Sequence, residues 1–140
     1  MDTYKHRVNY YETDKMGITH HSNYPRFMEE ARVYWMDKLG WSYKKCEDLG
    51  ISSPVISLNC KYRKNTTFDD IIEIETKLVK YNGIRLTIRY IMKNDGDIVV
   101  IGETEHCMIN KDGRIIRLKK EYPELDKILY EQLDKDKKNL

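Results

Sequence analysis

Residues 10–24 read Tyr10-Tyr11-Glu12-Thr13-Asp14-Lys15-Met16-Gly17-Ile18-Thr19-His20-His21-Ser22-Asn23-Tyr24. The segment places a carboxylate, a glycine and two histidines just before the clearest helical pattern in the chain. Beyond it, apolar residues recur at steps of three and four, as on one face of an amphipathic helix. They are Tyr24, Phe27, Met28, Ala31, Tyr34, Trp35 and Leu39. The pattern predicts a long helix over residues 24–39.

This helix has recognisable end signals. Ser22 or Asn23 can cap its start by accepting a hydrogen bond from a free backbone N–H. Pro25 suits the first turn, because the N–H that proline lacks would be unpaired there. Gly40 suits the end, because the residue past the last turn often takes a positive φ.

Asp14, Gly17 and His21 therefore fall on a loop that leads into a helix N-terminus. Backbone N–H groups point outward there, and the helix dipole favours negative charge. The arrangement suits acyl transfer, since a carboxylate can attack a carbonyl or activate water while N–H groups hold the developing oxyanion. The competing interpretation makes Asp14 and Asn23 only turn and cap residues, and the pattern alone favours it.

A longer motif resembles a known family. It fixes unlike residue types at set spacing: Tyr11, Thr13, Asp14, Gly17, His21, Asn23, Tyr24 and Phe27, then Glu30-Ala31-Arg32. This pattern resembles the signature of the 4-hydroxybenzoyl-CoA thioesterase family, which includes small bacterial acyl-CoA thioesterases and has the hotdog fold. The likeness continues at Tyr62-Arg63-Lys64-Asn65-Thr66-Thr67-Phe68-Asp69-Asp70 and so covers most of the chain.

The resemblance implies an acyl-CoA thioesterase, which hydrolyses an acyl thioester to a free carboxylic acid and coenzyme A. It implies that Asp14 is the nucleophile or the general base and leaves that choice open. N–H groups from Gly17 to His21 would polarise the thioester carbonyl, with His21 acting mainly through its backbone. A thiolate leaves readily because its pKa is low beside that of an alkoxide, so no strong general acid is needed. No cofactor is expected, since coenzyme A is part of the substrate.

The candidate substrate-binding residues are Tyr24, Lys61, Arg63, Lys64, Asn65 and Thr66. Cations at a groove mouth attract the phosphates of coenzyme A, although the three basic residues fit a solvated strand edge equally well. Aromatic residues such as Tyr24 more often fill a core than an acyl pocket. No metal site is predicted, because the adjacent His20 and His21 are hard to aim at one ion. His6 and His106 lie on separate strands and are expected to be satisfied within the sheet.

The rest of the chain predicts a sheet. Alternation of apolar and polar residues predicts strands over 4–10, 54–63, 71–81, 84–92 and 98–110. Asn82-Gly83 predicts a type I′ hairpin turn, in which both central residues need positive φ. A short helix is expected over 41–50 and a C-terminal amphipathic helix from Pro123, with residues 134–140 fraying. The result is one α+β domain over residues 1–140, with the order of elements of a hotdog fold, in which an antiparallel sheet wraps around one long central helix.

The composition limits the function classes. Charged residues make up 34% of the 140 residues, but the formal net charge of +2 favours neither nucleic acid nor a membrane as partner. No apolar run approaches membrane-spanning length, and the first five residues do not resemble a signal peptide. Cys46, Cys60 and Cys107 are odd in number and widely spaced, as expected of reduced thiols in a cytoplasmic protein.

The resemblance also implies a homodimer or homotetramer whose sheets join edge to edge, with the Asp14 loop of one protomer facing Lys61–Thr67 of the other. Three alternatives to an acyl-CoA thioesterase stay open. An acyl-carrier-protein thioesterase on the same fold tends to bring its histidine nearer to the aspartate than the gap between Asp14 and His21. A hydratase or dehydratase needs a motif that is absent here. A non-catalytic acyl-CoA-binding module would bind the thioester without hydrolysing it.

Overall fold

The computed structural model describes residues 3–138 as a single α+β domain. Its strands are β1 (Tyr4–Arg7), β2 (Val55–Tyr62), β3 (Ile71–Tyr81), β4 (Arg85–Asn94) and β5 (Asp97–Cys107). Its α-helices are α1 (Tyr24–Leu39), α2 (Tyr43–Asp48), α3 (Leu118–Glu121) and α4 (Pro123–Lys138). Two short 3₁₀ helices, over Tyr10–Glu12 and His21–Asn23, lie in the connection from β1 to α1.

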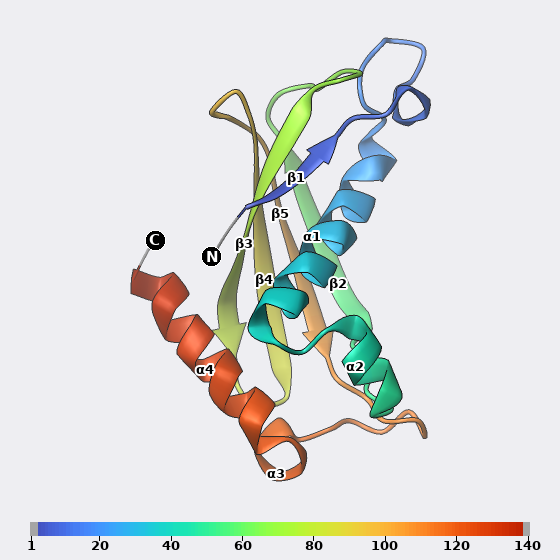
Figure 1. Ribbon diagram of the computed structural model, residues 1–140. Helices are drawn as coiled ribbons and strands as arrows, with labels where there is room; N and C mark the ends of the chain where they lie inside the picture. The colour runs from blue at the N-terminus through green and yellow to red at the C-terminus, as the bar shows by residue number, and fades with distance from the viewer. Residues whose placement is uncertain (1–2, 139–140) are drawn as a thin grey trace.

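The five strands form one antiparallel sheet in the order β1-β3-β4-β5-β2, and α1 crosses one face of it (Figure 1). The predicted helix is confirmed at both ends, with Pro25 in its first turn and Gly40 at a φ of 85°. Its buried face, which includes Phe27, Met28 and Trp35, packs against the sheet to form the core. The sheet and its central helix have the predicted hotdog arrangement.

A glycine makes room for a side chain of α1 on the sheet. A Cβ atom added at Gly102 on β5 would lie 1.9 Å from the Met28 Cε atom and 3.2 Å from the Asn59 carbonyl oxygen. The first distance is far inside van der Waals contact, so the absence of a side chain at Gly102 lets the Met28 side chain lie against β5.

The strand β2 differs from the others, because it lies at an edge of the sheet and is exposed along nearly all of its length. Its apolar side chains Val55, Ile56, Leu58 and Tyr62 are 42–51% exposed. Among residues 3–138, no strand pairs with its outer edge. An exposed apolar edge strand is a template for pairing with another chain.

Three predictions about the strands and turns are wrong, the third of them at the end of β5. The strand β1 ends at Arg7, and Tyr10 lies instead in a 3₁₀ helix with 77% of its surface exposed. Gly83 has a positive φ but Asn82 does not, because the Asn82 side chain accepts hydrogen bonds from the two following N–H groups of Ile84 and Arg85. This side-chain turn replaces the type I′ geometry.

The type I′ signature occurs at the next hairpin, where Asp95 and Gly96 have φ values of 50° and 83°. At the far end of the sheet, β5 stops at Cys107 rather than continuing to residue 110. Within residues 3–138, no helix is both long and apolar enough to cross a membrane.

The C-terminal helix α4 is longer than predicted. It continues to Lys138, so the expected fraying from residue 134 is wrong for residues 134–138, and residues 139–140 lie outside the described part. The Asp136 carboxylate is buried and accepts a hydrogen bond of 2.8 Å from the backbone N–H of Leu78 on β3. A second buried contact, from the Tyr81 hydroxyl to Asp126, attaches the start of the helix. These charged residues therefore fasten α4 to the sheet.

Candidate active site

The loop from Thr13 to Thr19 holds Asp14 in a tight turn. The Asp14 N–H donates to the Ile18 carbonyl oxygen (2.9 Å), and the Gly17 N–H donates back to the Asp14 carbonyl oxygen (3.0 Å). Gly17 makes this turn possible with a φ of 80°, which L residues with a Cβ rarely adopt. The Asp14 Oδ1 atom accepts a 2.8 Å hydrogen bond from the Met16 N–H. One carboxylate oxygen is thus fixed by the loop, in a half-buried side chain whose other oxygen remains for chemistry.

Residues 66 and 67 fasten this loop to the same chain. The Thr19 N–H donates to the Thr66 carbonyl oxygen (2.8 Å), and the Thr67 hydroxyl donates to the Gly17 carbonyl oxygen (2.7 Å). The Thr66 hydroxyl, in a side chain only 1% exposed, is within 2.9 Å of the Tyr24 hydroxyl. The structure therefore places two of the six predicted substrate-binding residues, Tyr24 and Thr66, in the support beneath the loop. Residues 66 and 67 contact the loop of their own chain, and the facing of Lys61–Thr67 and a partner's loop stays a prediction.

Glu12 ties the loop to β1 and to the start of α1. Its buried carboxylate contacts His6 Nε2 (2.9 Å) and accepts the Asn9 N–H (2.7 Å). Its carbonyl oxygen accepts both the His20 N–H (2.8 Å) and the Asn23 Nδ2–H (2.9 Å). Asn23 therefore anchors the loop, and the predicted side-chain cap is wrong because no side chain caps the start of α1. As predicted, the ring of His6 is satisfied within the protein.

The backbone N–H groups of residues 17–21 differ in whether they have an acceptor within the chain. Those of Gly17, Thr19 and His20 all donate within the chain. Among residues 3–138, the N–H groups of Ile18 and His21 have no acceptor. His21 begins the 3₁₀ helix that runs directly into α1, so its free N–H lies at the positive end of a long helix dipole.

Tyr62, which the sequence analysis did not single out as a site residue, contacts this position from the end of β2. Its hydroxyl donates a long 3.4 Å hydrogen bond to the His21 carbonyl oxygen, and its ring meets the His21 ring edge-on with centroids 6.3 Å apart. Partial burial and the neighbouring Cys60 thiol raise the pKa of Tyr62 to about 12, so the phenol remains a donor at neutral pH.

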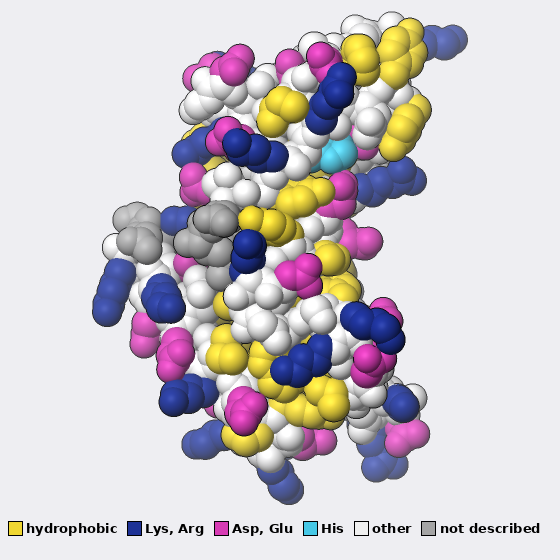
Figure 2. Space-filling model, in the orientation of Figure 1, with side chains coloured by type: hydrophobic (Ala, Val, Ile, Leu, Met, Phe, Trp, Pro, Cys, Tyr) yellow, Lys and Arg dark blue, Asp and Glu magenta, His cyan; other side chains and the backbone are white. Residues whose placement is uncertain are grey.

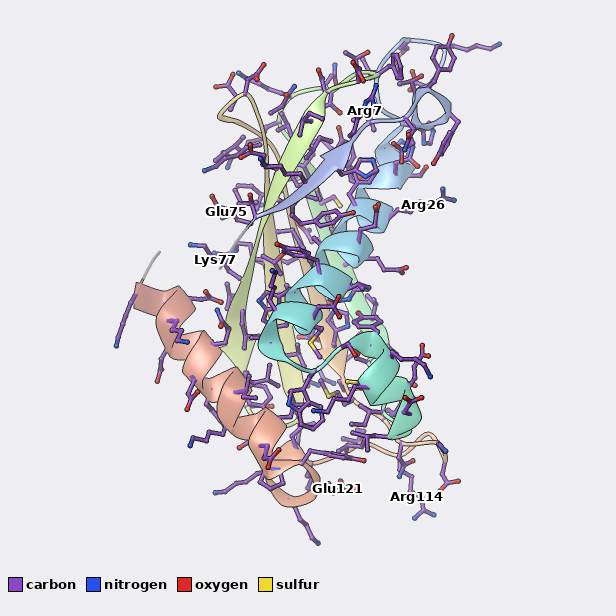
Figure 3. All side chains as sticks on the ribbon, in the orientation of Figure 1. Arg7, Arg26, Glu75, Lys77, Arg114 and Glu121 are labelled. Atoms are coloured by element: carbon purple, nitrogen blue, oxygen red, sulfur yellow. The ribbon has the colours of Figure 1, made fainter. Side chains whose placement is uncertain are left out.

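The predicted phosphate-binding residues Lys61, Arg63 and Lys64, and the predicted substrate-binding residue Asn65, precede the Thr66–Thr67 segment that contacts the loop. Lys61, Arg63, Lys64 and Asn65 are all exposed, and the Lys64 Nζ pairs with Asp97 at 3.1 Å. A further cation, Arg26, projects outward from the first turn of α1 (Figure 3). The basic side chains of Lys61, Arg63 and Arg26 are therefore exposed in segments that adjoin the Asp14 loop.

Hydrophobic side chains gather at the tip of the molecule, over the connection from β1 to α1 (Figure 2). Tyr10, Tyr11 and Met16 are each more than three-quarters exposed, and Phe68 packs against the Tyr10 ring. The loop that carries Asp14 is thus bordered by apolar as well as basic surface.

A cavity of about 380 Å³ lies at the opposite end of β2 from this loop. It is bounded by α1, α2, residues 51–55 and residues 108–109, and it contains none of the predicted site residues. Sequence reasoning missed it because its walls come from four separate segments. The one available signal was Arg32, a charged residue that falls between Met28 and Trp35 of the predicted apolar face and is buried in the structure.

Metal ligands do not gather anywhere in the described part of the chain. No group of three or more His, Cys, Asp or Glu residues within 3–138 is arranged to hold a metal ion. The Cys46, Cys60 and Cys107 side chains are free thiols. His106 is satisfied within the sheet, as predicted, by the Ser53 carbonyl oxygen and the Thr104 hydroxyl.

The family follows from comparison with known proteins. The model of the thioesterase-like superfamily matches residues 8–133, which include the Asp14 loop, α1 and the strands β2 to β5. The chain belongs to the thioesterase-like superfamily. This confirms the family predicted from the motif and makes the protein a thioester hydrolase.

Individual relatives of this thioesterase agree. It is 37% identical to a putative esterase of Aquifex aeolicus over 122 residues, covering 87% of this chain and 94% of the relative. It is 31% identical to the putative acyl-CoA thioesterase YneP of Bacillus subtilis, covering 84% and 86% of the two chains. The solved structure of DHNA-CoA thioesterase from Staphylococcus aureus superposes with a TM-score of 0.93 at 31% identity, covering 99% and 95%. The hotdog fold is thereby confirmed.

Proposed function

We propose that this thioesterase hydrolyses acyl-CoA at the Asp14 loop to a free carboxylic acid and coenzyme A. The observation that carries the proposal is the pairing of a loop-held carboxylate with the free N–H of His21 at a helix start. The Bacillus subtilis relative is named as an acyl-CoA thioesterase, which supports this substrate class.

In the proposed reaction, the thioester carbonyl oxygen accepts the His21 N–H and gains negative charge as the carbonyl carbon is attacked. The attacking group is either the free Asp14 oxygen or a water whose proton Asp14 takes. The C–S bond then breaks and the electron pair leaves with the sulfur of coenzyme A. An acyl-aspartate, where it forms, is hydrolysed by water. Coenzyme A enters only as part of the substrate, so no cofactor is involved.

Charge on the surface favours coenzyme A over other thiol carriers. Lys61, Arg63 and Arg26 are exposed near the loop, where their charges can meet the phosphates of the carrier. The free thiols of all three cysteines support a reducing compartment, and we propose that the protein acts in the cytoplasm.

Measuring the release of free thiol tests this function. With a panel of acyl-CoA esters and the matching acyl-carrier-protein thioesters, we expect turnover of acyl-CoA with a kcat/KM that falls as salt screens the phosphate contacts. A higher kcat/KM for the carrier-protein thioesters would instead identify the protein as an acyl-carrier-protein thioesterase. Tight binding of acyl-CoA with no thiol release would identify a binding module.

We also propose that the enzyme is a two-fold dimer joined through β2. Val55, Leu58 and Tyr62 share one face of this strand, because they pair with buried residues of β5 on either side of a bulge at Ile56. Tyr62 packs against Tyr24 of α1, so this is the face that α1 covers. The helix leaves Val55 and Leu58 more than 40% exposed. Antiparallel pairing of two β2 edges would continue the sheet and bury these side chains beneath a second copy.

A charge placed on this face should separate the dimer. We expect Leu58→Glu to yield a monomer of 16.8 kDa in sedimentation, because each interface would bury two unpaired carboxylates. The matched control is Asn59→Glu, which adds the same charge on the opposite face of the strand and should remain dimeric. If Leu58→Glu stays dimeric, or if the wild-type protein is a monomer, the interface lies elsewhere or does not exist.

A further inference from the structure

Arg32 is a buried cation on the wall of the cavity at the start of β2. Its side chain comes from α1 and is only 8% exposed, yet no carboxylate within residues 3–138 forms an ion pair with it. Its guanidinium is held instead by two phenol oxygens: Nε donates to Tyr43 (2.7 Å) and Nη1 donates to Tyr90 (3.0 Å). A guanidinium has five N–H groups, so others remain for a ligand.

Two effects act on this charge. Burial favours the neutral form, but the oxygens of Tyr90 and Tyr43 outweigh it, so the pKa of Arg32 is raised. The cavity wall therefore carries a permanent positive charge, and a buried charge with no counter-ion is costly unless an acceptor faces it.

A chain of hydrogen bonds fixes where Arg32 points. Burial lowers the pKa of His106, so this ring is neutral, and its Nδ1–H donates to the Ser53 carbonyl oxygen (3.0 Å). His106 Nε2 is then an acceptor for the Thr104 hydroxyl (2.8 Å), Thr104 accepts the Tyr90 O–H (2.7 Å), and Tyr90 accepts Arg32. Each link has one consistent direction, which preorganises the guanidinium.

Beside the main cavity lies a smaller space of about 10 Å³, bounded by Arg32, Tyr43, Ser53, His106 and Trp35 among others. It is about the size of a single oxygen-centred group. The Trp35 indole N–H is buried and has no acceptor in residues 3–138. Two residues that line this space, Arg32 and Trp35, thus carry N–H groups for which residues 3–138 supply no acceptor.

The main cavity suits an acyl group. Its 380 Å³ falls within the range of small-molecule pockets, and Met36, Ile51 and Met108 give it apolar walls. The carboxylates of Glu29 and Glu47 also line it but belong to exposed residues. An occupant of the cavity therefore meets apolar walls and, among the lining residues, a fixed cation with free donors.

We propose that this cavity is the acyl subsite of the thioesterase, and that Arg32 selects acyl groups bearing an acceptor oxygen, a hydroxyl or carboxylate, at the end remote from the thioester. This inference rests on the proposed acyl-CoA hydrolysis at Asp14. An acyl group that ends in a hydrocarbon would fill the same space but leave the Arg32 N–H groups without an acceptor. The missing hydrogen bond would make the enzyme prefer acyl groups that carry the oxygen.

The cavity serves the catalytic loop of the partner subunit. Within one chain, Val55 lines the cavity and Tyr62 contacts His21 beside the loop. These two residues are seven positions apart on β2, so the cavity and the loop are separated by about 23 Å along the strand. Two-fold antiparallel pairing centred near Leu58 reverses one strand and brings Val55 of one copy opposite Tyr62 of the other. For the same reason, the monomer produced by Leu58→Glu should lose turnover as well as mass.

Pairs of substrates with the same shape test, on the wild-type enzyme, whether acyl groups with a terminal acceptor oxygen are preferred. We use two pairs that differ only in a terminal hydroxyl or methyl group: 4-hydroxybenzoyl-CoA with 4-methylbenzoyl-CoA, and 6-hydroxyhexanoyl-CoA with heptanoyl-CoA. In at least one pair, we expect the hydroxyl ester to be preferred by roughly ten- to a hundredfold in kcat/KM, as for a hydrogen bond to a charged group. Equal kcat/KM values within both pairs would overturn the proposal.

The variant Arg32→Met then assigns the preference to this side chain. It keeps a long apolar stem and removes the charge, so we expect the hydroxyl-to-methyl ratio to fall to about one while the methyl ester is still hydrolysed. An unchanged ratio would refute the role of Arg32. The ratio compares two substrates on the same protein sample, so a lower fraction of folded enzyme changes both kcat/KM values equally and leaves the ratio unchanged. If the variant does not fold, the comparison of the two ester pairs on the wild-type enzyme still tests the proposal. Absence of thiol release from every ester would instead reject the hydrolysis itself.

Discussion

Replacing Asp14 by Asn is expected to lower kcat by at least about 10²-fold, within the range attributed to a positioned acid–base group. The amide keeps the size of the side chain, and its Oδ1 can still accept the Met16 N–H that holds the turn. The fold should therefore survive while the only carboxylate of the turn disappears. The measurement is thiol release under saturating acyl-CoA, with unfolding followed by circular dichroism.

The control for this variant is Asp112→Asn, the same chemical change in an exposed turn remote from the loop. It should leave kcat unchanged. A folded Asp14→Asn enzyme with near-wild-type kcat would show that another group attacks the thioester or activates water.

The second large effect is expected at His21, where backbone and side chain can be separated. His21→Pro deletes the N–H as well as the imidazole, and should lower kcat by about 10²–10³, the usual cost of losing one oxyanion donor. The backbone accepts proline here. His20 has an extended conformation (φ −65°, ψ 132°), as favoured before proline, and position 21 begins a helix, where proline is tolerated.

The matched variant is His21→Ala, which removes the imidazole and keeps the N–H. Its kcat should stay within about tenfold of wild type, since the donor is still in place. Equal and severe losses in both variants would assign a chemical role to the ring. Equal and small losses would place the oxyanion donor elsewhere, with the free N–H of Ile18 as the next group to test.

Local signals in the sequence predicted the central helix and the sheet well. The apolar face of α1, its Pro25 start and its Gly40 end are decided by short-range geometry, so they could be predicted from spacing alone. The Asp14 turn has the same local origin, because Gly17 supplies the positive φ that closes it.

The errors arise where side chains from distant segments replace local rules. Asn82 bonds its own turn through its side chain, and Asn23 turns back to the Glu12 carbonyl instead of capping α1. The charged end of α4 was predicted to fray because the hydrogen bond that holds it, from the Leu78 N–H of β3 to the Asp136 carboxylate, joins segments far apart in the sequence.

Within the site, the loop could be predicted but its surroundings could not. Thr66 and Tyr24 were expected to bind substrate, yet their hydroxyls meet in the support beneath the loop. The Arg32 cavity is built from four segments that no sequence window contains. Tyr62 reaches His21 only because the edge strand β2 ends beside the start of α1.

The Asp14 loop is proposed both to bind the thioester and to cleave it. The most direct measurement compares binding and thiol release for one acyl-CoA on wild-type protein and on Asp14→Asn. We predict the same Kd for both proteins, with rapid thiol release by the wild type and almost none by the variant, because Asp14 acts mainly in the transition state. Thiol release by both proteins at the same rate, or by neither despite equal binding, would contradict this account.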